Sequence, residues 1–155
     1  MPLAMGVSIE PASPDSPAAR RIIAELEAEL DPLYPEESRH GYSVDKLLSE
    51  GVDFFLVHYR EKPVGCGGVQ LNGTEYGELK RMYISPAFRG LGLARRLVDH
   101  LAEHALQQGV SILRLETGVH QAEAIRLYEG MGFRRIPPFG PYRPDPLSLF
   151  FERAS

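Results

Sequence analysis

The sequence predicts one α/β domain, residues 1–155, in which a mixed β-sheet carries helices on both faces. The length of 155 residues and the 43% content of hydrophobic residues are those of a single globular domain. Strand patterns joined by short turns fill the middle of the chain, and strands alternate with helices after them. No proline occurs between Ala87 and Ile136, so the longest regular elements are expected there.

The composition argues against several classes of protein. The 17 basic and 21 acidic residues give a net charge of −4, which argues against a nucleic-acid partner. The single cysteine excludes an internal disulfide framework and a cysteine-based zinc cage, and we expect no metal. The longest apolar run, residues 54–57, is far shorter than the roughly 20 residues of a membrane-spanning helix. Because the first part of the chain also shows no secretory signal, we expect a cytoplasmic protein without a membrane partner.

Capping and turn residues delimit the elements of the first half. Asp15 or Ser16 can cap a helix that has a proline at its first position, and Ser43 can cap a shorter second helix. Asn72-Gly73 is a strong signal for a hairpin between two strands. Strands are expected at 7–10, 53–59, 64–71 and 76–84, a turn at 61–63, and helices from Pro17 to before Pro32 and from Ser43 to Gly51.

The second half contains the clearest helix, which begins at residue 93 and is stopped by Gly109. Apolar side chains recur along one face of it: Leu93, Leu97, Val98, Leu101 and Ala105. We interpret His100 and His104, which lie off this face, as solvated. A strand at 111–116, a helix at 121–130 and closing strands at 133–136 and 147–152 complete the order β-α-α-β-β-β-α-β-α-β-β. The last strand could lie at a sheet edge, where a homodimer could form.

The segment between the strand 76–84 and the helix at residue 93 has the properties of a phosphate cradle. A helix N-terminus presents unpaired N–H groups and a partial positive charge, and glycines allow a phosphate to approach the backbone. Gly90 and Gly92 precede this helix, and Arg89 adds a charged donor. A plain turn is one alternative. A dinucleotide fingerprint is another, but Arg95 stands at its third glycine position, and no Gly-Lys-Ser/Thr follows for a Walker loop.

Three motifs in the same order resemble one family. Arg89-x-x-Gly92-x-Ala94 is similar to the signature of the GNAT superfamily of acyl-CoA N-acyltransferases. Residues 78–86 resemble the fourth strand of that family, and residues 124–133 resemble its second motif, a helix that ends in Tyr-x-x-x-Gly-Phe. The resemblance is close over residues 52–133. It implies a mostly antiparallel sheet that is splayed between the fourth strand and the strand at 112–116.

The resemblance also implies an acetyl-CoA site. The backbone of the loop before the helix would hold the pyrophosphate, and the edge of the preceding strand would pair with the pantetheine amides. The cofactor-binding residues implied in this way are Met82, Tyr83, Ile84, Arg89, Gly90, Leu91, Gly92, Leu93 and Ala94. Arg95 and Arg96 either assist the phosphates or are solvated charges.

Transfer of an acyl group to an amine needs a base for the amine and an acid for the leaving thiolate. Glu78 stands eleven residues before Arg89, the spacing of the catalytic glutamate in the histone-modifying branch of the family. Glu75, Glu116 and ordered waters are alternatives, and Glu78 could also be a surface residue. Tyr128 matches the general-acid tyrosine of the family, and its alternative role is that of a core aromatic residue.

The acceptor side has fewer signals. A proline-rich loop that contains Phe139 and Tyr142 could wall a compact pocket or only pack the domain. His120 could contact substrate, and an arginine could pair with an acceptor carboxylate. The candidate arginines are Arg143, Arg81 and Arg39.

These residues favour an N-acetyltransferase that acts on a small amine bearing a carboxylate, with acetyl-CoA as donor. Two alternatives stay open: acetylation of protein lysines or N-termini, and a CoA-binding regulatory module without catalysis. Cys66, in a glycine-flanked strand, is expected to be a buried thiol.

Overall fold

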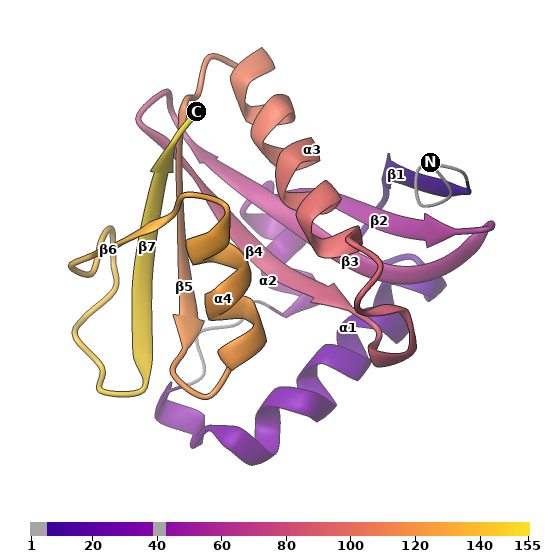
Figure 1. Ribbon diagram of the computed structural model, residues 1–155, viewed down its shortest axis with the longest axis horizontal. Helices are drawn as coiled ribbons and strands as arrows, with labels where there is room; N and C mark the ends of the chain where they lie inside the picture. Colours follow the sequence, from indigo (N-terminus) through magenta and orange to yellow (C-terminus); the bar gives the residue numbers. More distant parts are fainter. Residues whose placement is uncertain (1–5, 39–42) are drawn as a thin grey trace.

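The computed structural model of the protein describes residues 6–38 and 43–155. Its centre is a sheet of seven strands in the order β1-β2-β3-β4-β5-β7-β6 (Figure 1). β4 and β5 run parallel, and every other neighbouring pair is antiparallel. The strands are β1 (Val7–Pro11), β2 (Asp53–Tyr59), β3 (Lys62–Asn72), β4 (Tyr76–Ile84), β5 (Ile112–Gly118), β6 (Arg134–Ile136) and β7 (Ser148–Ala154). The mixed sheet predicted from the sequence is confirmed.

The helices begin where the capping residues predict. Of the two candidate caps for α1, Ser16 takes this role, because its Oγ accepts the N–H of Ala19 at 3.3 Å. Asp15 instead pairs with Arg20. The helices are α1 (Pro17–Leu30), α2 (Val44–Ser49), α3 (Leu93–Gln107) and α4 (Ala122–Gly130), with short 3-10 turns η2 (Asp31–Leu33), η3 (Glu36–Ser38) and η4 (Pro86–Phe88).

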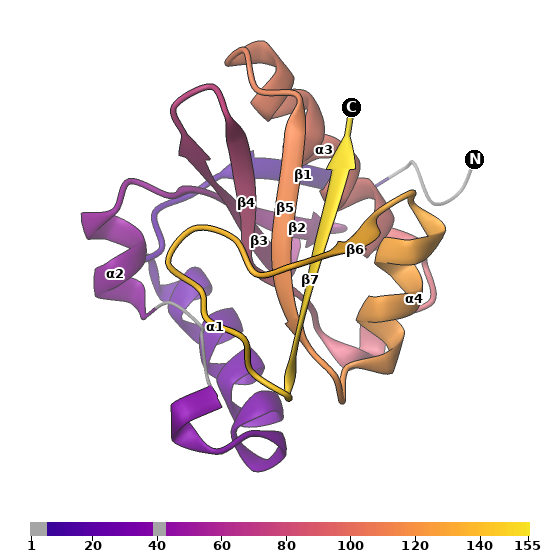
Figure 2. The ribbon, with the colours of Figure 1, turned by 90° about the vertical axis from the view of Figure 1, so that its left-hand side faces the viewer.

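Two hydrophobic cores cover the two faces of the sheet. α1 and α2 pack on one face, where Ile22 and Leu47 are fully buried among strand residues such as Cys66. α3 and α4 pack on the other face, where Leu97 and Leu101 belong to the larger cluster. Figure 2 shows α1 and α2 on one side of the strands and α4 on the other. Helices therefore lie on both faces, as predicted.

Three details differ from the sequence-based expectation. The strand expected at an edge is β7, which lies between β5 and β6 because both of its sides are paired. The turn between β2 and β3 lies at Arg60 and Glu61, which have φ of 51° and 68°, so β3 already begins at Lys62. The histidines of α3 are not fully solvated: His104 Nε2 lies 2.8 Å from Asp53 Oδ2, and burial lowers the pKa of His100.

β4 leaves the regular pairing of the sheet in two places. It pairs with β5 at only two positions, Gly77 with Leu113 and Glu78 with Arg114, and the two strands then separate. On its other side the register with β3 shifts, so that residues 81–82 face the single residue Gly67. A Cβ on Gly67 would lie 2.6 Å from Met82 Sδ and 2.9 Å from Leu97 Cδ2, so a larger residue there would displace side chains that pack on the bulge. The predicted splay of the sheet is present at this point.

No helix of residues 6–38 and 43–155 is long and apolar enough to cross a membrane. Within the same ranges, no group of three or more His, Cys, Asp and Glu side chains could hold a metal ion.

Cys66 gives a direct test of the core. Its thiol is completely buried, Sγ donates to the carbonyl oxygen of Arg81 at 3.2 Å, and burial raises its pKa to about 12. The reactive thiolate is therefore scarce at pH 8, whereas an unfolded chain has a thiol pKa of roughly 8.5. We expect no reaction with Ellman's reagent in the folded protein and reaction of one thiol after denaturation in urea. Rapid labelling of the native protein would contradict this burial.

Candidate active site

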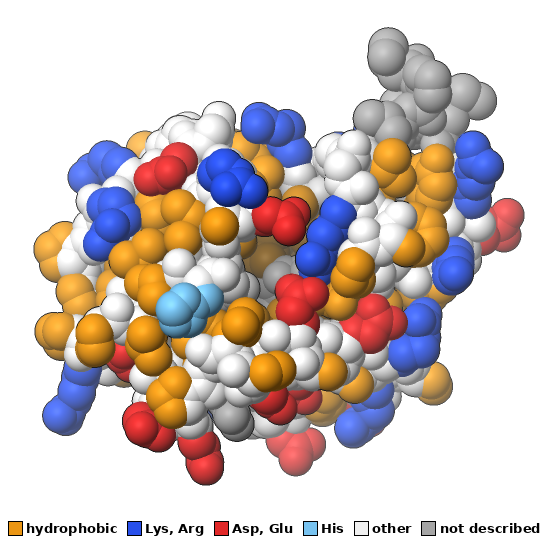
Figure 3. Space-filling model, turned by 60° about the horizontal axis from the view of Figure 1, so that its bottom comes forward, with side chains coloured by type: hydrophobic (Ala, Val, Ile, Leu, Met, Phe, Trp, Pro, Cys, Tyr) orange, Lys and Arg blue, Asp and Glu red, His pale blue; other side chains and the backbone are white. Residues whose placement is uncertain are grey.

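A cavity of about 190 Å³ lies at the point where β4 and β5 separate. α1 and the turn after it form one wall, β4 and β5 form the floor, and α4 and the β6–β7 loop complete the lining. Figure 3 shows a hollow on this side of the molecule with acidic and basic side chains around its rim. The cavity thus gathers residues from both halves of the chain.

Tyr128 reaches this cavity from α4. The helix ends two residues later, at Gly130: the N–H of Phe133 donates to the carbonyl oxygen of Tyr128 at 3.0 Å, and Gly132 adopts a φ of 89°. The rings of Tyr128 and Phe133 pack edge to face, with centroids 5.5 Å apart. Only 5% of Tyr128 is exposed, and burial raises the pKa of its hydroxyl above the usual value of 10. This hydroxyl therefore stays protonated at neutral pH, as a proton donor must.

Glu78 lies on β4 inside the cavity and is part of a closed triangle of polar groups. Its Oε2 lies 2.9 Å from Lys80 Nζ and accepts a hydrogen bond from the hydroxyl of Tyr142 at 2.5 Å. Lys80 Nζ also donates to the same hydroxyl at 3.1 Å. Glu78 and Lys80 are only 3% and 6% exposed, and burial lowers the pKa of Lys80 while Glu78 opposes this shift. The proline-rich loop is thereby anchored to β4.

Lys80 was not among the residues selected from the sequence. A signal for it exists, because residues 78 and 80 of one strand point to the same face and carry opposite charges. Tyr142 was selected, but its contact with Glu78 spans 64 residues of sequence and could not be inferred locally.

Tyr34, at the end of the α1 wall, was also missed. Its hydroxyl accepts the backbone N–H of His120 at 3.0 Å, and the two rings lie 5.5 Å apart. Its ring lies so close to Gly118 that no Cβ could be placed on that residue. Tyr34 therefore joins α1 to the turn between β5 and α4 and closes one end of the cavity.

The loop before α3 has the backbone conformation expected of an anion cradle. Gly90 and Gly92 adopt φ of 82° and 80°, and a Cβ on either would meet no atom within 4 Å. The first hydrogen bond of α3 runs from the N–H of Arg96 to the carbonyl oxygen of Gly92 at 3.1 Å. The amides of residues 93–95 thus precede the hydrogen bonds of the helix itself. The open space and these amides fit the diphosphate of a coenzyme.

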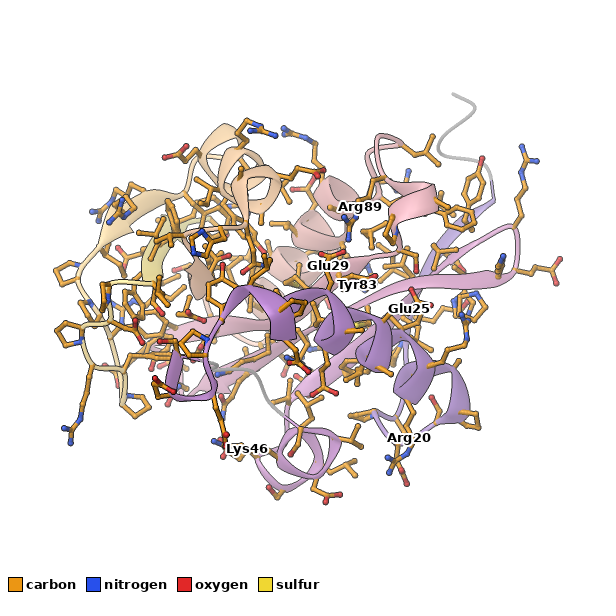
Figure 4. The ribbon with its side chains drawn as sticks, turned by 90° about the horizontal axis from the view of Figure 1, so that it is seen from below. Arg20, Glu25, Glu29, Lys46, Tyr83 and Arg89 are labelled. Atoms are coloured by element: carbon orange, nitrogen blue, oxygen red, sulfur yellow. The ribbon has the colours of Figure 1, made fainter. Side chains whose placement is uncertain are left out.

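The side chain of Arg89 has other partners. Its Nε donates to the carbonyl oxygen of Ile84 at 2.8 Å, and its Nη2 donates to Glu29 at 2.9 Å. Its guanidinium also stacks on Tyr83, 5.4 Å from the ring centroid. Figure 4 shows Arg89 and Tyr83 beside Glu29 of α1. Arg89 therefore ties the loop to α1, and main-chain amides are the donors that the loop offers.

Several predicted acceptor residues lie outside the cavity. Phe139 is 7% exposed and packs against Tyr76 and Phe150, so it belongs to the core, as the alternative interpretation held. His120 and Arg143 are exposed and are not among the residues that line the cavity. Arg39 lies outside the described residues.

The remaining candidates divide between the cavity and its surroundings. Arg81, Met82 and Glu116 line the cavity, as Tyr142 does. Glu75 is exposed in the turn before β4 and is not among the lining residues, so its position does not suit a base.

Residues 20–133 match the family model described as the acetyltransferase (GNAT) family. The chain belongs to this family. Among curated proteins it is 43% identical over 149 residues to an IAA acetyltransferase of Azospirillum brasilense, covering 95% of this chain and 97% of that protein. It is 38% identical over 134 residues to an uncharacterized N-acetyltransferase, YjgM, of Escherichia coli, covering 79% of this chain and 78% of that protein.

Solved structures agree with this assignment. A Klebsiella pneumoniae protein assigned as an acyl-CoA N-acyltransferase is 34% identical, with a TM-score of 0.82 over 97% of this chain and 98% of that chain. A GNAT-family acetyltransferase of Elizabethkingia anophelis with acetyl-CoA bound shares the fold at 18% identity, with a TM-score of 0.71 over 97% and 99% of the two chains. The predicted family, fold, enzyme class and acetyl-CoA donor are confirmed.

The contact between Gly118 and Tyr34 predicts a steric effect. Gly118→Ala forces Tyr34 away from its hydrogen bond with His120, and overpacking of this kind costs roughly 1–3 kcal/mol. Gly130→Ala is the matched control, because its Cβ would lie 3.6 Å from its nearest neighbour, Arg95. Urea unfolding should show a loss of stability for the first variant and none for the second. Equal stability of the two variants would contradict the tight seating of Tyr34.

Proposed function

We propose that this acetyltransferase transfers the acetyl group of acetyl-CoA directly to the primary amine of a small molecule that carries a carboxylate. The observation that carries the proposal is the meeting of Glu78 and Tyr128 in one compact cavity where β4 and β5 separate. A proton acceptor and a protonated phenol are the two groups that amide formation from a thioester requires.

The donor side is supported by two features of the backbone. The amides at the start of α3 and the open space above Gly90 and Gly92 suit a diphosphate. Beyond Glu78, the edge of β4 on the side of β5 has no paired strand. Main-chain groups of Met82–Ile84 can therefore bind the pantetheine arm. When bound, acetyl-CoA supplies an acetyl group activated as a thioester.

Tyr128 and Glu78 each take part in one proton transfer. As the amine nitrogen bonds to the acetyl carbon and the carbon–sulfur bond breaks, the Tyr128 hydroxyl gives its proton to the sulfur. The proton lost by the nitrogen passes to Glu78, directly or through water. A free tyrosine has a pKa of roughly 10 and a free thiol one of roughly 8.5, and burial raises the pKa of Tyr128 further. The proton transfer is therefore uphill, and the exclusion of water, which also raises the pKa of the leaving thiol, offsets part of this cost.

The position of the single cysteine supports direct transfer. Cys66 is fully buried in β3 and hydrogen-bonded to the backbone of β4, so it cannot carry an acyl group. Catalysis then rests on holding the amine against the thioester, which can supply a large part of the rate.

The acceptor is a small molecule rather than a protein. The cavity volume of about 190 Å³ is below the roughly 300–1,000 Å³ of typical ligand pockets, and Tyr34 and Tyr142 bound it. Its lining holds two cations, Lys80 and Arg81, beside four carboxylates, and one of the two cations would have to pair with an acceptor carboxylate. The relative of Azospirillum brasilense is named for acetylation of IAA, which is consistent with a small-molecule acceptor.

A panel of acceptors tests the proposal. Thiol release from acetyl-CoA is measured with amino acids, simple amines without an acid group, and peptides offering a lysine or a free N-terminus. We expect turnover with small amino acids. Turnover with peptides alone would instead indicate a protein acetyltransferase. Binding of acetyl-CoA without turnover of any amine would indicate a regulatory module and would overturn the proposal.

The role of Tyr128 has a separate test. Loss of a general acid typically lowers a rate about 10²- to 10⁴-fold, so Tyr128→Phe should reduce kcat in this range with little change in the KM for acetyl-CoA. Because burial raises the pKa of this hydroxyl, the parent should lose no activity through its ionisation up to about pH 10. Tyr59→Phe, outside the cavity, is the control. Equal rates for Tyr128→Phe and parent from pH 6 to 10 would exclude this acid.

A further inference from the structure

Arg81 occupies an unusual position on β4. It lies in the bulge opposite Gly67 and adopts a φ of 55°, a left-handed conformation that residues other than glycine rarely take. Arg60 and Glu61 share this conformation, but they lie in an exposed turn. Arg81 instead has a side chain that is only 6% exposed. A strained backbone that buries a cation in a cavity wall indicates a function for that cation.

The guanidinium of Arg81 is incompletely satisfied. Its Nη2 lies 3.0 Å from Glu27 Oε2, but Nε and Nη2 are buried without a hydrogen-bond partner. The contact with Glu27 is therefore an ion pair whose angle does not suit a hydrogen bond. The side chain of Glu27 is 51% exposed, so it is free to move into solvent. Burial lowers the pKa of Arg81, and the charge of Glu27 opposes this shift.

The other cation of the cavity has a different environment. Lys80 Nζ contacts both Glu78 and the hydroxyl of Tyr142, and all three side chains hold one another in place. A carboxylate that bound Lys80 would have to compete with a buried ion pair. Arg81 presents a planar edge of two N–H groups, which matches the two oxygens of a carboxylate.

We propose that the Nε–Nη2 edge of Arg81 binds the carboxylate of the acceptor, which takes the place that Glu27 holds in the free enzyme. This inference rests on the proposed function and names the residue that selects an acidic amine. A neutral acceptor would leave the edge of Arg81 unpaired, and an unsatisfied buried group is costly. Acidic acceptors are thus selected because only a carboxylate supplies the missing hydrogen-bond partners of the buried Arg81 guanidinium.

The strand also sets a scale for the acceptor. Glu78 and Arg81 are three positions apart on β4, for which a regular strand would give an upper limit of roughly 10 Å, and the bulge at Arg81 shortens this separation. The amine must lie near Glu78 and the carboxylate near Arg81. Acceptors of different lengths therefore report on the separation of the two groups.

Matched pairs of acceptors test this inference. Glycine, 4-aminobutyrate and L-phenylalanine are each compared with the corresponding carboxamide, and kcat and KM are measured separately at saturating acetyl-CoA. The variants are Arg81→Gln, Glu27→Gln and Arg60→Gln. Arg60 is the matched control, since it also has a left-handed backbone but is exposed and lies outside the cavity. Comparing each variant with the parent cancels the different basicity of acid and amide.

Arg81→Gln should raise the KM for the acids about 10- to 100-fold, as loss of a charged hydrogen-bonding partner does, and change the KM for the amides little. Glu27→Gln should lower the KM for the acids several-fold because it removes the competing charge. Arg60→Gln should change neither. Calorimetric titration of 4-aminobutyrate into the protein with coenzyme A bound should show the same order of affinities.

The outcomes separate this inference from the proposed function. If the parent acetylates neither acids nor amides, both fail. If Arg81→Gln affects acids and amides equally, Arg81 does not bind the carboxylate, and acetyl transfer to small amines still stands. If Arg81→Gln does not fold, Glu27→Gln decides: an unchanged preference of acid over amide overturns the inference, and an increased preference supports it.

Discussion

The separation of β4 from β5 after two residue pairs is the constraint on which the site depends. Parallel strands normally stay paired because unpaired N–H and C=O groups inside a protein are costly. Here Gly67 allows the bulge at residues 81–82, which turns β4 away from its neighbour. A ligand with amide groups between the two strands would supply hydrogen-bond partners for their unpaired N–H and C=O groups. The cavity and Tyr128 border this gap, and the loop before α3 follows the end of β4 in the chain.

Charge inside the gap is balanced locally. Glu78 and Lys80 neutralise each other, and Tyr142 bonds to both, so two buried ions share a closed network. The proline-rich loop supplies Tyr142, and Phe139 of the same loop packs in a small core with Tyr76. The loop thus fixes the orientation of the Glu78 carboxylate, and its rigidity has a purpose beyond closing the domain.

α1 connects the donor and acceptor sides. Glu25 accepts a hydrogen bond from Ser85 at 2.7 Å, and Glu29 accepts one from Arg89 at 2.9 Å, so the helix is tied to the segment that leads into α3. Figure 4 shows both glutamates on the side of α1 near this segment. Glu27 lies between them in sequence but faces Arg81 in the cavity. One helix therefore contacts both the loop proposed for the donor and the wall proposed for the acceptor.

The sequence by itself determined the elements and the donor loop. Capping by Ser16 and Ser43, the Asn72-Gly73 turn, the apolar stripe of α3 and the glycines before it are local signals, and short-range geometry decides them. Only the tertiary structure decided which side chains share the cavity. Lys80, Tyr34 and Glu27 entered it, whereas Phe139, His120 and Arg143 did not. These placements depend on contacts between residues far apart in the chain, such as Tyr142 with Glu78, which no local pattern encodes.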